Sequence, residues 1–316
     1  MTYKCEHKSR DRWVLGLDIG GTRIRLAFIN KNGYVYNFKA LKSRDFKKDS
    51  QTDERLASLV EQNVLQSDIS WEQLDAIVLG LPATLDRRNK IVYSCPNFRD
   101  LEGEKVLKTF EARFPVPIVI ENDVNLAIVG EHWLGAAQGY QDVLGIFVGT
   151  GLGCGIILNG RLHQGSHGVA AELGHIPVPE KDDVCGCGNR GCIELYAAGV
   201  ALERALQEHQ EASSDIQEIF LRARNGDKFW QHTVRQFLTM LAIAIATAIN
   251  IIDPQVVIIG GGIPQIPGFP FNELVEKVFS HTRKPEPARS LHIKRAVLGD
   301  LAGLIGAAKI GSQTAA

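Results

Sequence analysis

The sequence has no excess of charge of one sign. Its 316 residues include 35 Lys and Arg and 36 Asp and Glu, which gives a formal net charge of −1. Proteins that hold nucleic acid by neutralising its phosphates concentrate positive charge, and neither half of this chain is strongly basic. The composition therefore argues against a nucleic-acid partner.

Long apolar runs are also scarce. Residues 1–11 are polar and lack the apolar core of a secretion signal. The most apolar run, residues 241–252, is too short to span a bilayer and is interrupted by Thr247 and Asn250. We therefore expect a buried helix in this region, no membrane partner, and a cytoplasmic protein.

Cysteine is too infrequent for a disulfide scaffold, with six in the whole chain. Three of them, Cys185, Cys187 and Cys192, are crowded among glycines that permit tight bends. This spacing is typical of a structural zinc ion with four ligands; three incidental thiols or redox chemistry are the alternatives, and no Cys-x-x-Cys precedes a helix. Three histidines lie close enough along the chain to supply a fourth ligand: His163, His167 and His175.

The phosphate-binding pattern Gly-x-x-x-x-Gly-Lys-Ser/Thr is absent, but another glycine turn is present. Residues 14–19 and 23–30 are predicted strands joined by Gly20-Gly21-Thr22. Two glycines let backbone N–H groups approach an anion, and Thr22 adds a hydroxyl donor. Asp18, at the end of the first strand, suits a metal ion or its bound water, although an Asp that caps an ordinary hairpin explains it too.

The chain contains a weak internal repeat of domain size. Residues 14–20 align without a gap on residues 143–149, and Asn30 then falls on Asn159. The second copy carries the turn Gly149-Thr150-Gly151-Leu152-Gly153. The repeat predicts two similar domains, each with a glycine turn, that grip a polyphosphate between them. A third run, Gly260-Gly261-Gly262, follows the apolar strand 255–259 and suits a nucleotide contact or a plain turn.

A polar cluster, Glu121-Asn122-Asp123-Val124-Asn125, lies between a predicted strand and a predicted helix. Open α/β sheets bind ligands at the carboxyl ends of their strands. A carboxylate there can accept a proton from a hydroxyl, so Asp123 is a candidate general base, with helix capping as the alternative. By contrast, Asn97 follows Pro96 in a loop and is explained as a turn residue.

Taken in order, these motifs resemble the ROK family of sugar kinases, within the actin-like ATPase and hexokinase superfamily. Two further stretches support the resemblance, residues 172–175 (Glu-Leu-Gly-His) and the cysteine loop 185–192. The resemblance implies an α/β fold of two actin-like (ribonuclease H-like) domains around a central cleft, with a zinc-binding loop in the second domain. Residues 1–120 with a C-terminal helix, 301–316, would form the first domain, and residues 121–300 the second.

The resemblance also assigns roles to residues, with Asp123 as the catalytic base. The implied sugar-binding residues are Asn97, Asn122, Asp123, Glu172, His175 and Glu194. The implied ATP-binding residues are Gly20, Gly21, Thr22, Gly149, Thr150, Gly151, Gly153, Gly261 and Gly262, with Asp18 near Mg²⁺. The implied zinc ligands are His175, Cys185, Cys187 and Cys192.

The activity implied is ATP-dependent phosphorylation of the primary (6-) hydroxyl of a hexose, by a homodimer that uses Mg²⁺ and a structural Zn²⁺. Many family members are repressors with an N-terminal winged helix-turn-helix, but only about a dozen residues precede the first strand here, which favours a kinase. Residues 80–84 depart from the Gly-x-Pro-Gly of the family's glucokinases and, with residues 89–97 and 262–270, are similar to D-allose kinases. D-Allose is therefore the predicted substrate. The alternatives are glucose, N-acetylmannosamine, or a non-catalytic sugar-sensing regulator.

Overall fold

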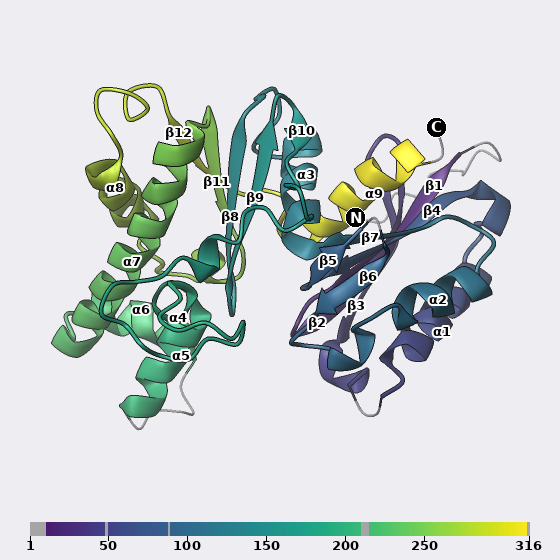
Figure 1. Cartoon of the computed structure of the whole chain (residues 1–316), viewed down its shortest axis with the longest axis horizontal. Coiled ribbons are helices and arrows are strands. Elements are labelled where there is room, and N and C mark those ends of the chain that lie inside the picture. Colours follow the sequence, from purple (N-terminus) through teal and green to yellow (C-terminus); the bar gives the residue numbers. More distant parts are fainter. Residues whose placement is uncertain (1–10, 48–49, 88, 210–214, 315–316) are drawn as a thin grey trace. The chain divides into compact units, whose positions relative to one another are not determined.

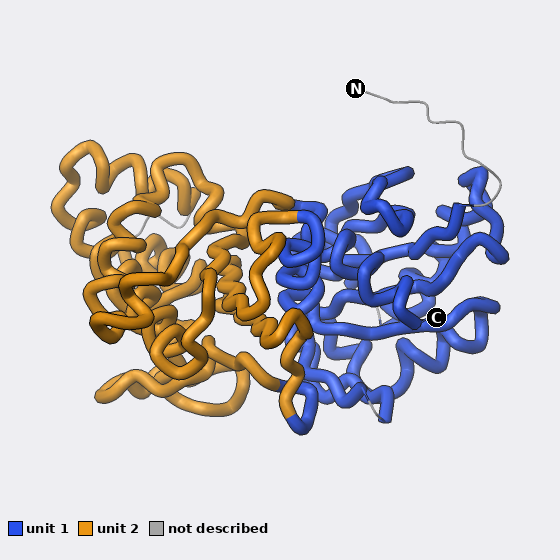
Figure 2. The backbone as a smooth tube through the Cα atoms, turned by 90° about the horizontal axis from the view of Figure 1, so that it is seen from above, with its two compact units in different colours: residues 1–134, 166–169, 300–316 blue, residues 135–165, 170–299 orange. Residues whose placement is uncertain are grey.

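The chain divides into two compact units, coloured separately in Figure 2. The computed structural model describes residues 11–47, 50–87, 89–209 and 215–314. Unit 1 comprises residues 1–134, 166–169 and 300–316, and unit 2 comprises residues 135–165 and 170–299. Residues 121–134 were predicted to begin the second domain, but they lie in unit 1. The reason is that they form the last strand of its sheet and a helix packed on it.

Unit 1 is built on a five-stranded mixed sheet in the order β3-β2-β1-β4-β7; Figure 1 labels these strands. The strands are β1 (Trp13–Ile19), β2 (Arg23–Asn30), β3 (Val35–Lys42), β4 (Leu74–Leu81) and β7 (Ile118–Asn122). β1, β4 and β7 are parallel, whereas β2 and β3 run antiparallel. A small hairpin, β5 (Thr84–Asp86) and β6 (Ile91–Ser94), follows β4.

Helices cover both faces of this sheet because β1 is apolar on both sides. Leu15, Leu17 and Ile19 are buried in the same cluster as side chains of α1 (Thr52–Leu65) and α2 (Lys105–Arg113). On the other face lie α3 (Asp123–Leu134) and α9 (Ala302–Thr314). A Cβ on Gly306 of α9 would lie 1.8 Å from the Leu126 carbonyl oxygen, so the close approach of these two helices requires glycine.

Unit 2 repeats this arrangement, with a mixed sheet in the order β10-β9-β8-β11-β12. The strands are β8 (Val143–Val148), β9 (Leu152–Leu158), β10 (Arg161–Leu162), β11 (Val256–Gly260) and β12 (His292–Arg295). As in unit 1, the first strand pairs antiparallel with the second and parallel with the fourth. The internal repeat expected from the sequence is thereby confirmed as a structural one.

The helices of unit 2 are dominated by α7 (Lys228–Ile252), which was predicted to be a long buried helix. Among the described residues it is the one helix long and apolar enough to cross a membrane, yet half of its most apolar stretch is buried within the protein. Leu238, Leu241 and Ile245 are fully buried in the core of unit 2. The other helices are α4 (Glu194–Ala197), α5 (Gly199–Glu208), α6 (Ile216–Arg224) and α8 (Phe271–His281).

Candidate active site

The parallel strands of unit 1 end at one edge of its sheet, and the acidic residues gather there. The strand register places Asp18 of β1 beside Gly80 of β4, and Gly80 beside Glu121 of β7. Adjacent strands are about 4.8 Å apart, so this row spans only two strand spacings. Asp123 follows directly as the first residue of α3. The predicted magnesium-side acid and the predicted base are thus brought to the same edge.

Asp18 is the partly neutralised member of this group. Its Oδ2 accepts a hydrogen bond from Arg25 at 3.1 Å, and Arg25 also binds Asp300, just before α9, at 2.6 Å. Burial raises the pKa of Asp18, while the guanidinium of Arg25 opposes that shift. Arg25 was not among the predicted site residues. The hairpin register could have found it, because pairing outward from the Gly20-Gly21-Thr22 turn sets Arg25 opposite Asp18.

Asp123 has a raised pKa, as Asp18 does. Burial raises its pKa to about 7, and the negative charge of Asp18 acts in the same direction. Capping of α3 is performed mainly by Asn122, whose Oδ1 accepts from the backbone N–H groups of Val124 at 3.0 Å and Asn125 at 3.1 Å. A carboxyl with a pKa near neutrality can both accept and release a proton, as a general base requires.

Asn97 lies against the glycine turn of unit 1. A Cβ on Gly21 would sit 3.1 Å from the amide atoms of Asn97, tighter than an ordinary contact. The turn itself is closed by a hydrogen bond from Gly20 N to Arg23 O at 2.9 Å, and Ser43 Oγ donates to Gly20 O at 2.7 Å. Asn97 is thus more than a turn residue, because it borders the Gly20-Gly21-Thr22 turn. Its predicted contact with a sugar stays a prediction.

The start of α5 and the side chain of Glu194 form hydrogen bonds with the glycine turn of unit 2, residues 149–153. Gly199 N donates to Gly149 O at 2.8 Å, and Leu152 N donates to Glu194 Oε2 at 2.8 Å. A Cβ on Gly151 would lie 2.4 Å from that carboxylate oxygen. The structure shows that Glu194 fixes the turn, and its predicted contact with a sugar stays a prediction.

The third glycine segment lies beside the second. Gly261 has φ +93° and its Cβ would sit 2.4 Å from the carbonyl oxygen of Val148, the residue before Gly149. Only glycine fits there. Next to it, a Cβ on Gly262 would meet nothing within 4 Å, so its backbone faces open space. Unit 2 therefore offers two adjacent glycine turns, and Gly153 lies at the start of β9 immediately after one of them.

The predicted metal ligands come together in unit 2. One ligand atom from each of His175, Cys185, Cys187 and Cys192 lies within 4.8 Å of all the others. Cys187 Sγ and Cys192 Sγ are 3.7 Å apart, as are His175 Nδ1 and Cys185 Sγ. Two sulfurs that each bind a tetrahedral zinc at about 2.3 Å are about 3.8 Å from one another, so the spacing fits such an ion.

His175 connects this cluster to a predicted sugar-binding residue. Its Nδ1 faces Cys185, and its Nε2 lies 3.6 Å from Glu172 Oε2. His175 is thus the histidine of the cluster rather than His163 or His167, a choice that sequence spacing left open.

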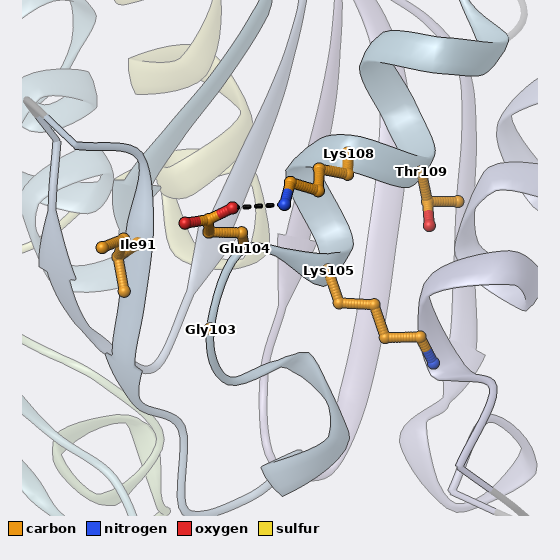
Figure 3. Close-up of a pocket in the computed structure, with 6 residues that line it drawn as sticks. All are labelled: Ile91, Gly103, Glu104, Lys105, Lys108 and Thr109. Carbon is orange, nitrogen blue, oxygen red and sulfur yellow. Dashed lines mark ion pairs between the residues drawn. The ribbon is translucent and has the colours of Figure 1, made fainter.

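Two hollows on the surface lie away from all these residues. One, in unit 1, has a volume of about 620 Å³, and Figure 3 shows residues of its wall, among them Glu104, Lys105 and Lys108. Its lysines are already paired, Lys108 with Glu104 at 2.5 Å and Lys105 with Asp53 at 2.9 Å. The other, of about 560 Å³, lies between α6, α7 and α8 in unit 2. Neither is lined by a residue predicted for sugar, nucleotide or metal.

Comparison with known proteins agrees with this arrangement. A model of the ROK family matches residues 14–314. The glucokinase of Thermotoga maritima is 31% identical over 313 residues, covering 94% of this chain and 96% of that protein. The N-acetyl-D-glucosamine kinase of Pasteurella multocida is 30% identical over 314 residues, covering 93% and 98%.

Among solved structures, the fold is similar to that of a ROK family glucokinase from Streptomyces griseus, in complex with glucose and AMPPNP. The TM-score is 0.81 at 30% sequence identity, with 95% of this chain and 99% of that chain covered. The family match over nearly the whole chain and the conserved architecture of both units lead to one conclusion: the chain belongs to the ROK family.

Proposed function

We propose that this protein is an ATP-dependent hexose kinase that phosphorylates the primary (6-) hydroxyl, with Asp123 as the general base. The observation that carries the proposal is the raised pKa of Asp123 at the strand edge it shares with Asp18. Relatives of similar length that are 30% identical or more are named glucokinase and N-acetyl-D-glucosamine kinase, which supports a hexose as substrate.

In the proposed reaction, ionised Asp123 accepts the proton of the sugar hydroxyl as its oxygen attacks the γ-phosphorus. The bond from that phosphorus to the bridging oxygen breaks, and ADP leaves. Positioning and charge stabilisation supply most of the rate enhancement in phosphoryl transfer. The glycine turns at Gly20, Gly149 and Gly261 would hold the phosphates through backbone N–H groups.

Magnesium would be held near Asp18, because carboxylate oxygens are the ligands that it prefers. When bound, it would neutralise phosphate charge during transfer. Arg25 would share Asp18 with the ion, since Arg25 now holds one oxygen of that carboxylate. This sharing keeps Asp18 neutralised when the nucleotide is absent.

Several of the proposed hexose ligands already have structural partners. Besides capping α3, Asn122 donates its amide to Ala83 O at 3.3 Å, and Glu194 uses one oxygen on Leu152 N. Fixed side chains discriminate between sugars well, because an unmatched buried polar group costs about 1–3 kcal/mol. The proposed set is Asn97, Asn122, Asp123, Glu172, His175 and Glu194.

We propose that the His175 and cysteine cluster binds a structural zinc ion. To bind metal through Nδ1, the neutral imidazole must carry its proton on Nε2, which points toward Glu172. The ion would thereby orient both His175 and Glu172 without contacting the reacting phosphate. Reduced thiols in this number suit a cytoplasmic location, and a homodimer is expected from the family resemblance.

D-Allose remains the proposed substrate within the hexose class. Ala83 stands where the glucokinases of the family have the last glycine of Gly-x-Pro-Gly, and its carbonyl accepts from the predicted sugar ligand Asn122. Ala83 is only 7% exposed, so its methyl group is held against its surroundings. A change at Ala83 therefore affects the orientation of Asn122, the proposed sugar ligand.

Replacing Asp123 with Asn tests the base. We expect kcat to fall by about 10²–10⁴-fold while hexose affinity changes little, because general base catalysis contributes that much. The folded-state pKa lies above the unfolded one, so ionising Asp123 on going from about pH 4 to about pH 8 destabilises the folded protein. The variant should therefore be more stable to urea than the wild type at the higher pH. The exposed Asp68→Asn is the control, and turnover within a few-fold of wild type would exclude Asp123 as the base.

Substrate choice is tested with a panel of D-allose, D-glucose, D-mannose, N-acetylmannosamine and N-acetylglucosamine, measured by hexose-dependent release of ADP. We expect the wild type to have its highest kcat/KM with D-allose. Ala83→Gly should shift the ratio toward glucose, by about 1–3 kcal/mol if a polar contact is realigned. The exposed Ala40→Gly, on a distant strand, controls for loss of a methyl group. A wild type that binds hexose without releasing ADP would indicate a sugar sensor instead.

The zinc proposal is tested by Cys187→Ser. Cys187 is exposed, so the change removes a ligand without opening a core cavity. We expect loss of the bound metal, measured by mass spectrometry after dialysis, and weaker hexose binding with ATP binding less affected. Val184→Ala, at an exposed position of the same loop, is the control. A metal-free variant with full activity would contradict a structural zinc.

A further inference from the structure

Arg87 has a role that its place in a surface turn does not suggest. It follows β5, yet its side chain is only 18% exposed, and all three guanidinium nitrogens are engaged. Nε donates to Glu121 Oε2 at 2.8 Å, and one terminal nitrogen donates to Glu121 Oε1. The other terminal nitrogen donates to the carbonyl oxygen of Gly168 at 2.9 Å.

One end of this arrangement leads to the proposed base. Glu121 is 3% exposed at its side chain, so its charge needs a partner, and Arg87 supplies it. The same carboxylate accepts from Asn122 N at 2.8 Å and from Asn125 Nδ2 at 2.9 Å. Asn122 caps α3, whose first residue is Asp123. The Arg87–Glu121 pair therefore fixes the backbone from which Asp123 projects.

The other end leads to the proposed sugar ligands of unit 2. Residues 166–169 belong to unit 1, whereas residues 165 and 170 belong to unit 2. The short segment is closed at its base by a hydrogen bond from Ala170 N to Gln164 O at 3.1 Å. Glu172 and His175 follow within a few residues. Arg87 thus holds the segment from which the chain continues to these two side chains.

Gly168 is shaped for this contact. Its φ is +78°, and a Cβ there would lie 2.7 Å from a terminal nitrogen of Arg87 and 3.0 Å from Leu85 O. A side chain at this position would displace the guanidinium from the carbonyl. Glycine therefore lets the segment come close enough to Arg87 to be bound.

We propose that Arg87 is a positioning residue for hexose binding, which links the start of α3 to the segment preceding Glu172 and His175. This inference rests on the proposed function for the identity of the sugar ligands. Arginine is required because its planar fork binds a carboxylate with two donors and still has a third for the Gly168 carbonyl. Lysine keeps the charge but is a point donor that cannot make both contacts.

The test is Arg87→Lys, with hexose and ATP dissociation constants measured by calorimetry on the full chain, together with kcat. We expect hexose affinity to weaken about tenfold, since small misplacements of ligand-positioning groups are costly. ATP affinity and metal content should stay near wild type, whereas the urea midpoint should fall, because buried Glu121 loses its bidentate partner. The control is Lys90→Met, which removes a cation from the same turn. Lys90 pairs with the exposed Glu111, so its loss should leave hexose affinity unchanged.

Gly168→Ala disturbs the same contact by placing a methyl group against the guanidinium of Arg87. It tests the proposal if Arg87→Lys does not fold. It should weaken hexose binding in the same way. Unchanged hexose affinity in a folded variant would overturn the proposal, and so would a parallel loss of hexose affinity and ATP affinity. If the wild type binds hexose without turnover, the proposed kinase activity fails, while a selective loss of hexose affinity in Arg87→Lys still supports the positioning role.

Discussion

The burial of carboxylates at one edge of a parallel sheet is the constraint on which unit 1 depends. Removing a negative charge from water is costly unless it is paired or becomes protonated. The three acids at this edge meet that cost in different ways. Glu121 has a bidentate arginine and backbone and amide donors, and Asp18 shares one arginine with Asp300. Asp123 has a second carboxylate, Asp18, as its charged neighbour, and burial raises the pKa of Asp123 to about 7.

This division of roles links structure to chemistry. A carboxylate that is fully neutralised, like Glu121, can only support its neighbours. One that is held by a single arginine can exchange part of that contact for a metal ion. A carboxylate whose pKa is raised to near 7 can act as a base at physiological pH. The three states follow from where two arginines, Arg25 and Arg87, are placed by the fold.

Unit 2 meets a different constraint, which is steric. Its glycine turns lie so close to Glu194, Val148 and the start of α5 that side chains at Gly151, Gly199 or Gly261 would collide. The loop of His175 and the cysteines begins next to this region, because the residues before it pack against Leu152 and Glu194: a Cβ on Gly174 would lie 2.7 Å from Leu152 O. A bound metal would therefore stabilise the loop of His175 and the cysteines, whose first residues already pack against the glycine turn at residues 149–153.

Much of the fold could be predicted from local patterns. Residues 14–20 and 143–149 share a strand and a glycine turn, which was enough to predict the repeat, and Arg25 was accessible from hairpin register. Arg87 could not be identified from the sequence, because its partners lie 34 and 81 residues away and no local pattern marks the turn after β5 as buried. The boundary after Leu134 was missed for a similar reason: residues 121–134 are assigned to unit 1 by the pairing of β7 with β4 and by the packing of α3 on α9, and both partners are distant in the sequence. The strand β12 (His-Ile-Lys-Arg) is too polar to be recognised as a strand.

The central claim is that burial tunes Asp123 for proton transfer, and carbon-13 NMR of the aspartate side-chain carboxyls measures this directly. Spectra of wild type and Asp123→Asn across the pH range identify the signal of Asp123 by its disappearance in the variant. The structure predicts that this carboxyl titrates with a midpoint near 7. A midpoint near about 3.9, the value of an ordinary exposed aspartate, would contradict the account.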